Sequence, residues 1–362
     1  MKAALLIIAV ALAALGFPPA SADDGFLSGV NRVNLAWRTR AEQQDILNQI
    51  AKSGVTDVRL SLARPVDRAI RALKIANRLG LSILLEVQLA NKSYYPPDRQ
   101  PRTAHGRTWD VHRLSDLDLD LYRSQLRQSL QEIDAAGIRL HAVEPGNEIN
   151  IAPYNGDLLI HPARRVRTAR GISELTNPAA FERGLDKYIE ALRITREELG
   201  RTALSREAKL ISAGLSDMGP GTADRLGFEH LNAAETIELL QQRGIDDIVD
   251  AYGIHIYPNR RTGPALARRI DRVLEFCRPD EAGTPCWITE WGIANVSRTC
   301  PVNDSKREPL IRQVRENFGD LSEAGRLEAV YYYDWDSHER YSIWRCGRLS
   351  PAGALAVGLE AQ

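Results

Sequence analysis

Residues 141–150 read HAVEPGNEIN, and residues 286–292 read CWITEWG. Each stretch is a short apolar run that leads into a glutamate, Glu148 in the first and Glu290 in the second. Such a run before turn residues is typical of a buried strand. If the carboxyl ends of these two strands meet in the fold, the two carboxyl groups face one small space. Whether they meet depends on the order of strands and helices along the whole chain.

Short apolar runs alternate with longer amphipathic segments along the sequence, and several amphipathic segments end at a glycine. We predict strands at 29–35, 57–62, 82–88, 140–144, 210–214, 248–255, 286–290 and 329–333. We predict helices at 42–53, 66–79, 119–136, 178–199, 234–243, 264–276, 311–324 and 351–359. Eight strand–helix units in this order predict an α/β fold, a parallel (β/α)8 TIM barrel. A doubly wound open sheet is the alternative, but no glycine-rich phosphate loop follows the first strand.

The N-terminus has the pattern of an export signal. Lys2 supplies a positive charge, residues 3–15 are apolar, and Ala20-Ser21-Ala22 is a small-x-small cleavage site. We expect residues 1–22 to be a signal peptide and residues 23–362 to be one barrel domain, since no linker-like stretch divides them. An uncleaved anchor is the alternative, although the apolar run is short for a membrane span. The expected location is secreted or periplasmic, with no stable membrane insertion after cleavage.

Charge and cysteine content narrow the partners and the compartment. Lys+Arg and Asp+Glu balance at 47 each, so no overall field attracts nucleic acid or an anionic membrane. A neutral carbohydrate polymer suits this balance. Four cysteines in an exported chain indicate disulfides, with three possible connectivities. In a barrel, two cysteines would lie at the amino ends of the strands and two at the carboxyl ends, which predicts the pairs Cys277–Cys286 and Cys300–Cys346.

The residues at the ends of the predicted strands resemble those of glycoside hydrolase clan A, the retaining (β/α)8 glycosidases, in its cellulase-like (family 5 or family 39-like) members. These enzymes carry an Asn-Glu pair after the fourth strand and a second glutamate after the seventh, which correspond here to Asn147-Glu148 and Glu290. Glu144 also falls where cellulase-like members often have an acidic residue. Supporting matches are Arg59 in VRLSLARP, His255 and Tyr257 in GIHIYP, and Trp335 in YYYDWDS.

The resemblance implies a role for each position. Glu148 would be the acid/base and Glu290 the nucleophile of a retaining mechanism. We expect Glu290 to be ionised beside Arg59, with a hydrogen bond from Tyr257, and Glu148 to be protonated at the start. The expected substrate contacts are Asn147 on the sugar 2-hydroxyl, His255, and aromatic faces of Trp335, Trp37 and Trp291.

This pattern predicts hydrolysis of β-glycosidic bonds in an extracytoplasmic polysaccharide or oligosaccharide, with a β-glucan as the first candidate and no cofactor or metal. Gln88 replaces the histidine that many cellulase-like members have after the third strand, which leaves the family within the clan open. One alternative is a glycan-binding or polysaccharide-assembly barrel without turnover. Another is a metal-dependent hydrolase that uses His255, although no H-x-H sequence ends the first strand.

Overall fold

The computed structural model describes residues 25–103, 110–161, 166–258, 261–279, 283–297 and 299–359. The predicted signal peptide at 1–22 lies outside these residues. All structural statements below concern the described part of the chain.

A nine-stranded parallel sheet forms the centre of the molecule, in the order β8-β6-β3-β2-β1-β13-β12-β11-β9. Its strands are β1 (Leu27–Asn31), β2 (Asp57–Ser61), β3 (Ser82–Val87), β6 (Ala142–Pro145), β8 (Lys209–Leu210), β9 (Leu215–Ser216), β11 (Tyr252–Ile256), β12 (Cys286–Trp291) and β13 (Leu327–Tyr332).

The two edge strands of this sheet belong to one chain segment, and this closes the barrel. β8 pairs with β6, and β9, five residues further along the chain, pairs with β11. Between them, Ile211 bridges to Ala251 and Gly214 bridges to Asn147, both in parallel orientation. Residues 209–216 therefore act as the fifth strand of an eight-stranded barrel, with its two halves assigned separately.

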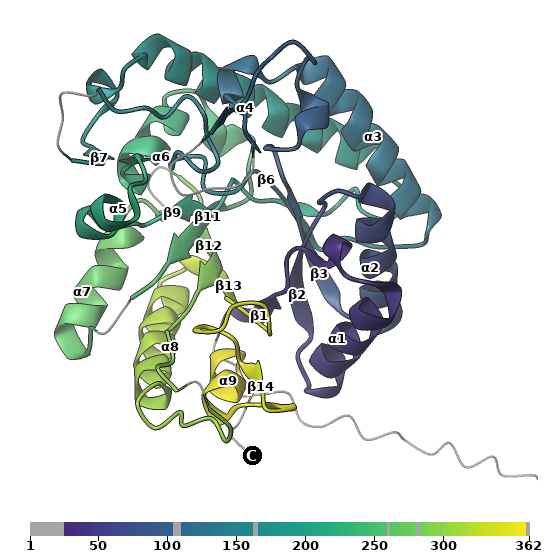
Figure 1. Cartoon of the computed structure of the whole chain (residues 1–362), viewed down its shortest axis with the longest axis vertical. Helices are drawn as coiled ribbons and strands as arrows, with labels where there is room; N and C mark the ends of the chain where they lie inside the picture. Colours follow the sequence, from purple (N-terminus) through teal and green to yellow (C-terminus); the bar gives the residue numbers. More distant parts are fainter. Residues whose placement is uncertain are drawn as a thin grey trace, which may run out of the picture.

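Helices surround the sheet on the outside (Figure 1). They are α1 (Arg40–Lys52), α2 (Val66–Arg78), α3 (Leu119–Ala135), α4 (Pro178–Gly200), α5 (Pro220–Leu226), α6 (Ala233–Gln241), α7 (Gly263–Val273), α8 (Glu308–Glu323) and α9 (Pro351–Ala356). Short two-stranded ladders lie in the connections: β4 (Arg102–Thr103) with β5 (Asp110–Val111), β7 (Thr168–Ala169) with β10 (His230–Leu231), and β14 (Trp344–Arg345) with β15 (Arg348–Leu349).

Local sequence explains where several helices begin and end. Thr39 and Glu42 form a reciprocal capping box at the start of α1. Asn177 caps α4, whose first residue is Pro178. Gly80 and Gly137 follow α2 and α3 with φ of 75° and 73°, a left-handed conformation that glycine adopts without a steric penalty. These signals are the ones from which the helices were predicted.

The structure confirms the (β/α)8 fold and refines its boundaries. The first strand ends at Asn31, four residues before its predicted end, and a 3-10 turn (Leu35–Trp37) follows it. The sixth strand begins at Tyr252 rather than 248, because residues 245–247 form another 3-10 turn. Helix α5 lies in a connection that the sequence analysis left without an element.

The barrel has two apolar layers. The larger one lies between the sheet and the helices. The smaller one fills the inside of the barrel and consists of Leu84, Ala142, Ile211, Ala251, Trp287, Ala329 and Tyr331. Because side chains on a strand alternate between its two faces, residues two positions further along these strands also point inward. Those positions carry the polar groups described below.

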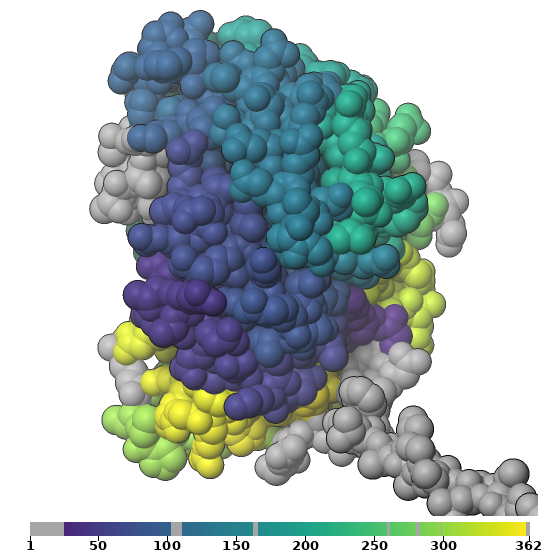
Figure 2. Space-filling model, turned by 90° about the vertical axis from the view of Figure 1, so that its right-hand side faces the viewer, coloured from purple at the N-terminus to yellow at the C-terminus, as the bar shows by residue number. Residues whose placement is uncertain are grey.

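The first and last parts of the barrel are neighbours in space. β1 pairs with β13, and Figure 2 shows the C-terminal segments against the N-terminal ones at the lower end of the view. Both predicted disulfides, Cys277–Cys286 and Cys300–Cys346, are confirmed. Among the described residues, no helix combines the length and apolar character that a bilayer crossing requires.

Candidate active site

A polar layer lies at the carboxyl ends of the barrel strands, directly after the inner apolar layer. Glu86 follows Leu84 by two residues on β3, Glu144 follows Ala142 on β6, and Thr289 follows Trp287 on β12. The period of two places all of these side chains inside the barrel. Active sites of this fold form at this end.

Arg59 of β2 is the hub of the layer and is fully buried. Its Nε donates to Glu144 at 2.6 Å and its Nη1 to Glu290 at 2.8 Å. Arg59 also donates to the side-chain amide oxygens of Asn31, at 3.0 Å, and Asn147, at 3.1 Å. Burial opposes the charged guanidinium, but Glu144 and Glu290 outweigh it and raise the pKa of Arg59. Arg59 is therefore a permanent cation between two carboxylates.

Glu290 of β12 receives hydrogen bonds on both carboxyl oxygens. Arg59 donates to Oε1, and the Tyr257 hydroxyl donates to Oε2 at 2.9 Å. Burial and the nearby Glu290 raise the pKa of Tyr257 well above its usual value, so that the phenol stays a donor. The Glu290 side chain keeps 11 % of its surface exposed. This carboxylate is held in one orientation and can still be approached.

Glu148 leaves the end of β6 in an unusual backbone conformation. Its φ is 43°, in the left-handed region that non-glycine residues seldom adopt. The Glu148 amide donates to the carbonyl of Gly214 at 2.9 Å, while the preceding Asn147 bridges to the same glycine. The fifth strand thus holds the backbone of the Asn-Glu pair and turns its side chains toward the centre of the barrel.

His255 of β11 brings the two glutamates together. Its Nδ1 lies 3.1 Å from Oε1 of Glu148 and 3.7 Å from Oε2 of Glu290. Burial alone would lower the pKa of His255, but the two carboxyl groups outweigh burial and raise it. The two glutamate oxygens can be no farther apart than the sum of these two distances. Glu148 and Glu290, separated by more than 140 positions in sequence, therefore face one space, as predicted.

Gly214 makes room for this histidine. A Cβ atom at position 214 would lie 2.1 Å from Nε2 of His255. No other side chain fits so close to the imidazole, because real carbon contacts do not reach that distance. The glycine was part of a predicted strand, but its role was not foreseen from the sequence.

Two of the three tryptophans predicted to contact substrate do not reach the site. Trp291 is fully buried on the outer face of β12, where it packs edge-on against Tyr332 and Phe318. The register of β12 shifts between Ile288 and Trp291, so Thr289 and Glu290 both face the inside of the barrel, whereas Trp291 faces α8. Trp335 is also fully buried and stacks on Trp344, with ring centroids 5.2 Å apart. Neither ring presents a free face to a ligand.

Trp37 lies in the turn after β1 and is 65 % exposed. Its indole N–H donates to the carbonyl of Arg64 at 3.0 Å, which fixes the ring edge. The position follows a strand end on the same side as the polar layer. An exposed, anchored ring at this position is compatible with the predicted role of Trp37 as a surface on which a sugar stacks.

Tyr333, directly after β13, is an aromatic residue that the sequence analysis did not assign to the site. Its ring lies 6.3 Å from that of Tyr257, and burial together with Glu290 raises its pKa. Tyr331 belongs to the inner apolar layer, so the period of two places Tyr333 on the inner face as well. The alternation in the Tyr-Tyr-Tyr run at 331–333 is the signal that identifies it.

Glu86 is the second residue that the sequence analysis did not assign. It is a fully buried carboxyl near the end of β3, after three apolar residues, in register with Glu144 of β6. Among the described residues, no group of three His, Cys, Asp or Glu side chains is arranged as metal ligands would be.

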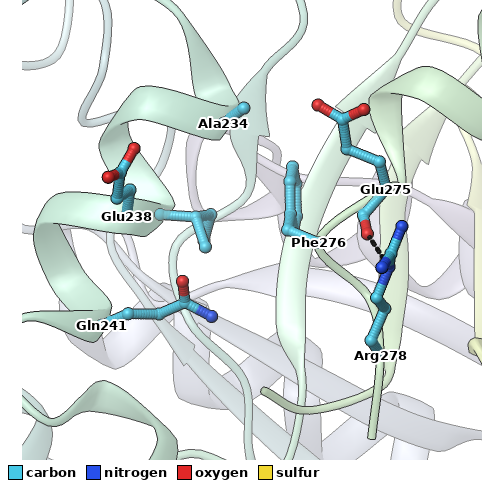
Figure 3. Close-up of a pocket in the computed structure, with 7 residues that line it drawn as sticks. Ala234, Glu238, Gln241, Glu275, Phe276 and Arg278 are labelled. Atoms are coloured by element: carbon cyan, nitrogen blue, oxygen red, sulfur yellow. Dashed lines mark hydrogen bonds between the residues drawn. The ribbon is translucent and has the colours of Figure 1, made fainter. Parts of the chain in front are cut away.

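A hollow with a volume of about 370 Å³ lies away from these residues, on the outside of the barrel (Figure 3). It lies between α6, which contributes Glu238 and Gln241, and the segment after α7, which contributes Phe276 and Arg278. None of the predicted site residues lines it. The raised pKa values of His255 and Tyr257, together with the hydrogen bonds around Arg59, identify the barrel end, rather than this hollow, as the candidate site.

Comparison with known proteins adds the fold relationship. No protein-family model and no curated protein matches the sequence. Solved structures do match: the structure of fungal β-1,4-galactanases has a TM-score of 0.54 and 16% identity over 92% of this chain and 93% of that one. The virulence factor SghA, in complex with its substrate analog salicin, has a TM-score of 0.57 and 13% identity over 95% and 100%.

A β-glucosidase from Exiguobacterium marinum has a TM-score of 0.54 and 13% identity over 93% of this chain and 98% of that one. At these identities the likeness is one of fold. The chain therefore shares the barrel of these proteins over nearly its whole described length, and the resemblance inferred from strand-end residues is confirmed at that level.

Proposed function

We propose that this protein is a retaining glycoside hydrolase that cleaves β-linked glycans outside the cytoplasm, with Glu290 as nucleophile and Glu148 as acid/base. The observation that carries the proposal is the shared contact of both glutamates with Nδ1 of His255. These two contacts limit the separation of the glutamate oxygens to at most about 6.8 Å. The spacing of retaining enzymes, about 5–5.5 Å, lies within this limit, whereas most of the inverting range, about 6.5–9.5 Å, lies beyond it.

The surroundings of the two glutamates suit different roles. Glu290 accepts two hydrogen bonds, one from the Arg59 guanidinium and one from Tyr257, which hold its oxygens in place for attack. Glu148 lies beside His255, and in this proposal its carboxyl supplies the proton that the leaving oxygen needs. Tyr257 and Arg59 aim the Glu290 oxygens before substrate arrives, so little reorganisation is required during reaction.

In the first step, Glu290 attacks the anomeric carbon while the glycosidic C–O bond breaks. Glu148 gives its proton to the departing oxygen, and a covalent glycosyl ester with Glu290 forms. In the second step, Glu148, now ionised, removes a proton from water, and the water oxygen attacks the same carbon. The bond to Glu290 breaks, both glutamates return to their first state, and the product keeps the β configuration.

Several features support the substrate class and location. The balanced charge suits a neutral polymer, and the named neighbours with TM-scores above 0.5 include a galactanase and a glucosidase. Two disulfides are typical of an oxidising compartment, as the proposed signal peptide at 1–22 requires. A β-glucan remains the first substrate to test, followed by galactan, mannan and xylan.

The test uses glutamate variants and azide. Glu148→Ala should lower kcat/KM on unactivated substrates by about 10²–10⁴-fold. With a 2,4-dinitrophenyl β-glycoside, whose leaving group departs without a proton, azide should restore turnover by forming a β-glycosyl azide. Glu290→Ala should be inactive, with azide yielding the α product instead. Glu323→Gln, on an exposed carboxyl at the end of α8, is the matched control. Near-normal activity of Glu290→Ala, or inverted stereochemistry of the wild-type product by NMR, would disprove the assignment.

A further inference from the structure

Glu86 lies in the floor of the candidate site but has none of the proposed catalytic roles. It points into the barrel from β3, level with Ser61 of β2 and Glu144 of β6. Its exposed fraction is 1 %. Three carboxyl groups, those of Glu86, Glu144 and Glu290, thus surround the single guanidinium of Arg59.

Arg59 cannot serve all three. Its hydrogen bonds go to Glu144, to Glu290 and to two amide oxygens, and none goes to Glu86. Oε1 of Glu86 is buried without a hydrogen-bond partner. A buried carboxylate with no paired cation and with one oxygen unbonded is strongly disfavoured, and such a group takes up a proton instead.

Burial and the surrounding charged groups together raise the pKa of Glu86 to about 8. Burial is the largest effect and raises this pKa, while Arg59 from β2 lowers it. The negative Glu144 and Glu290 raise it, and the Gln88 side chain, directly after β3, lowers it. Tyr94, from the turn after β3, is buried nearby and is neutral.

A small cavity lies beside Glu86 and offers a place toward which a protonated Glu86 can donate a hydrogen bond. Its volume is about 10 Å³, room for about one water molecule. Glu86 and Gln88 line it from β3 and its end, and Asn147 and Tyr154 line it from the connection after β6. A neutral carboxyl can donate a hydrogen bond there, whereas a carboxylate could not.

We propose that Glu86 is a neutral carboxylic acid and acts as a positioning residue. While Glu86 keeps its proton, Arg59 keeps its hydrogen bonds to Glu290 and Asn147. Ionisation of Glu86 disables the site. This inference rests on the proposed glycosidase function. An ionised Glu86 would compete for the guanidinium, and the donors that aim Glu290 and hold Asn147 would shift toward it. The expected consequence is a loss of activity at alkaline pH whose origin is Glu86 rather than the acid/base Glu148.

The protonation state can be measured without any substrate. Glu86 is neutral in the folded protein but ionised in the unfolded chain once the pH exceeds its ordinary value, 4.5. The unfolded wild type therefore releases a proton that the folded one retains, and wild type loses stability as the pH rises from about 5 to 8. Glu86→Gln carries no titrating group in either state. The difference in Tm, variant minus wild type, should grow over that range and level off above about pH 8.

The exposed variant Glu323→Gln provides the control, because its carboxylate is solvated in both states. Its difference in Tm should not vary with pH in the same way. A flat difference for Glu86→Gln between pH 5 and 8 would overturn the proposal, since it would mean that Glu86 titrates alike in the folded and unfolded chains.

The positioning role is measured with 2,4-dinitrophenyl β-glycosides of several sugars. Their leaving group departs without a proton, so the protonation of Glu148 no longer shapes kcat/KM. Wild type and Glu86→Asp, which keeps an ionisable group, should lose at least tenfold in kcat/KM between pH 7 and 9.5. Glu86→Gln should lose less than threefold over the same range. An alkaline loss that is equal in wild type and Glu86→Gln would overturn the positioning role, even if the stability result held.

The Tm comparison and the kinetic comparison together separate this inference from the proposed function. Absence of turnover on every aryl glycoside would argue against the glycosidase and, with it, against a positioning role for Glu86. The Tm comparison would still decide whether Glu86 is a neutral acid.

Discussion

Replacing Arg59 with methionine gives the sharpest test of the polar layer. Methionine has a similar length and is apolar. The change therefore removes the guanidinium and leaves Glu144 and Glu290 without their counter-charge. Both ion pairs are short, at 2.6 and 2.8 Å, and Arg59 and Glu144 are fully buried. Removal of one partner of a buried pair costs about 3–5 kcal/mol, mainly because the other charge stays behind without compensation.

The assay is urea unfolding at pH 7, with Glu144→Gln combined with Arg59→Met in a double-mutant cycle. The double variant has no unpaired charge at position 144. Its free energy of unfolding should therefore be about 1–3 kcal/mol higher than the sum of the single changes would give. Glu290, with 11 % of its side chain exposed, should contribute less to the penalty because water can partly solvate it.

Arg127→Met is the matched control. Arg127 forms a two-pronged pair with Glu198, at 2.8 Å for each contact, but is 40% exposed. Glu198 also keeps its contact with Arg123. Water screens a surface pair of this kind, so its loss should destabilise the protein far less than the loss of Arg59 does. If Arg59→Met cost no more than Arg127→Met, or if Glu144→Gln brought no recovery, the account of Arg59 as the obligatory counter-charge would be refuted.

Three further changes test other parts of the site. Gly214→Ala should displace the imidazole of His255, because the new Cβ overlaps it, and kcat/KM should fall by at least tenfold while the circular dichroism spectrum is kept. Tyr257→Phe removes a donor to the Glu290 carboxylate at 2.9 Å; such a bond contributes about 1.5–3 kcal/mol, so kcat/KM should fall by about 10- to 150-fold. Burial lowers the pKa of His230 to about 4 from the usual 6.5. The unfolded chain therefore binds a proton that the folded one rejects, so stability should fall as the pH drops from about 6.5 to 4, and less steeply in His230→Gln.

Each of these three has a control in the same chain. Gly319→Ala, inside α8 with open space around the added carbon, should leave activity unchanged and the protein at least as stable. Tyr341→Phe alters a ring that packs against Tyr257, while the hydrogen bond from Tyr257 to Glu290 remains. His141→Gln changes an exposed histidine. If a control variant changed activity or stability as much as the variant it is paired with, the effect of that variant could not be ascribed to its contact in the site.

The fold was predictable because its signals are local or periodic. Alternation of apolar runs with amphipathic segments, the capping box at Thr39, and glycines after helices each act within a few residues. Once the barrel was predicted, strand order alone placed Glu148 and Glu290 at the same end. The same reasoning paired the four cysteines correctly.

The aromatic contacts were less predictable, because they depend on which face of a strand or loop a ring occupies. Trp291 and Trp335 were assigned to substrate contact by resemblance, and the structure buries both. Tyr333 lies near Glu290 instead. A shift of one residue along a strand reverses the face, so a tryptophan next to a catalytic position points away from it.

The sequence by itself determined the barrel and the two acidic strand ends, since hydrophobic period and chain order encode both. Only the tertiary structure decided how charge is shared inside the barrel. Arg59, Glu86, Glu144 and Glu290 come from four strands, and which carboxyl receives the guanidinium depends on register and burial. Those are properties of the packed molecule, because a carboxyl group has its ordinary charge in water and changes it only when neighbours and desolvation act together.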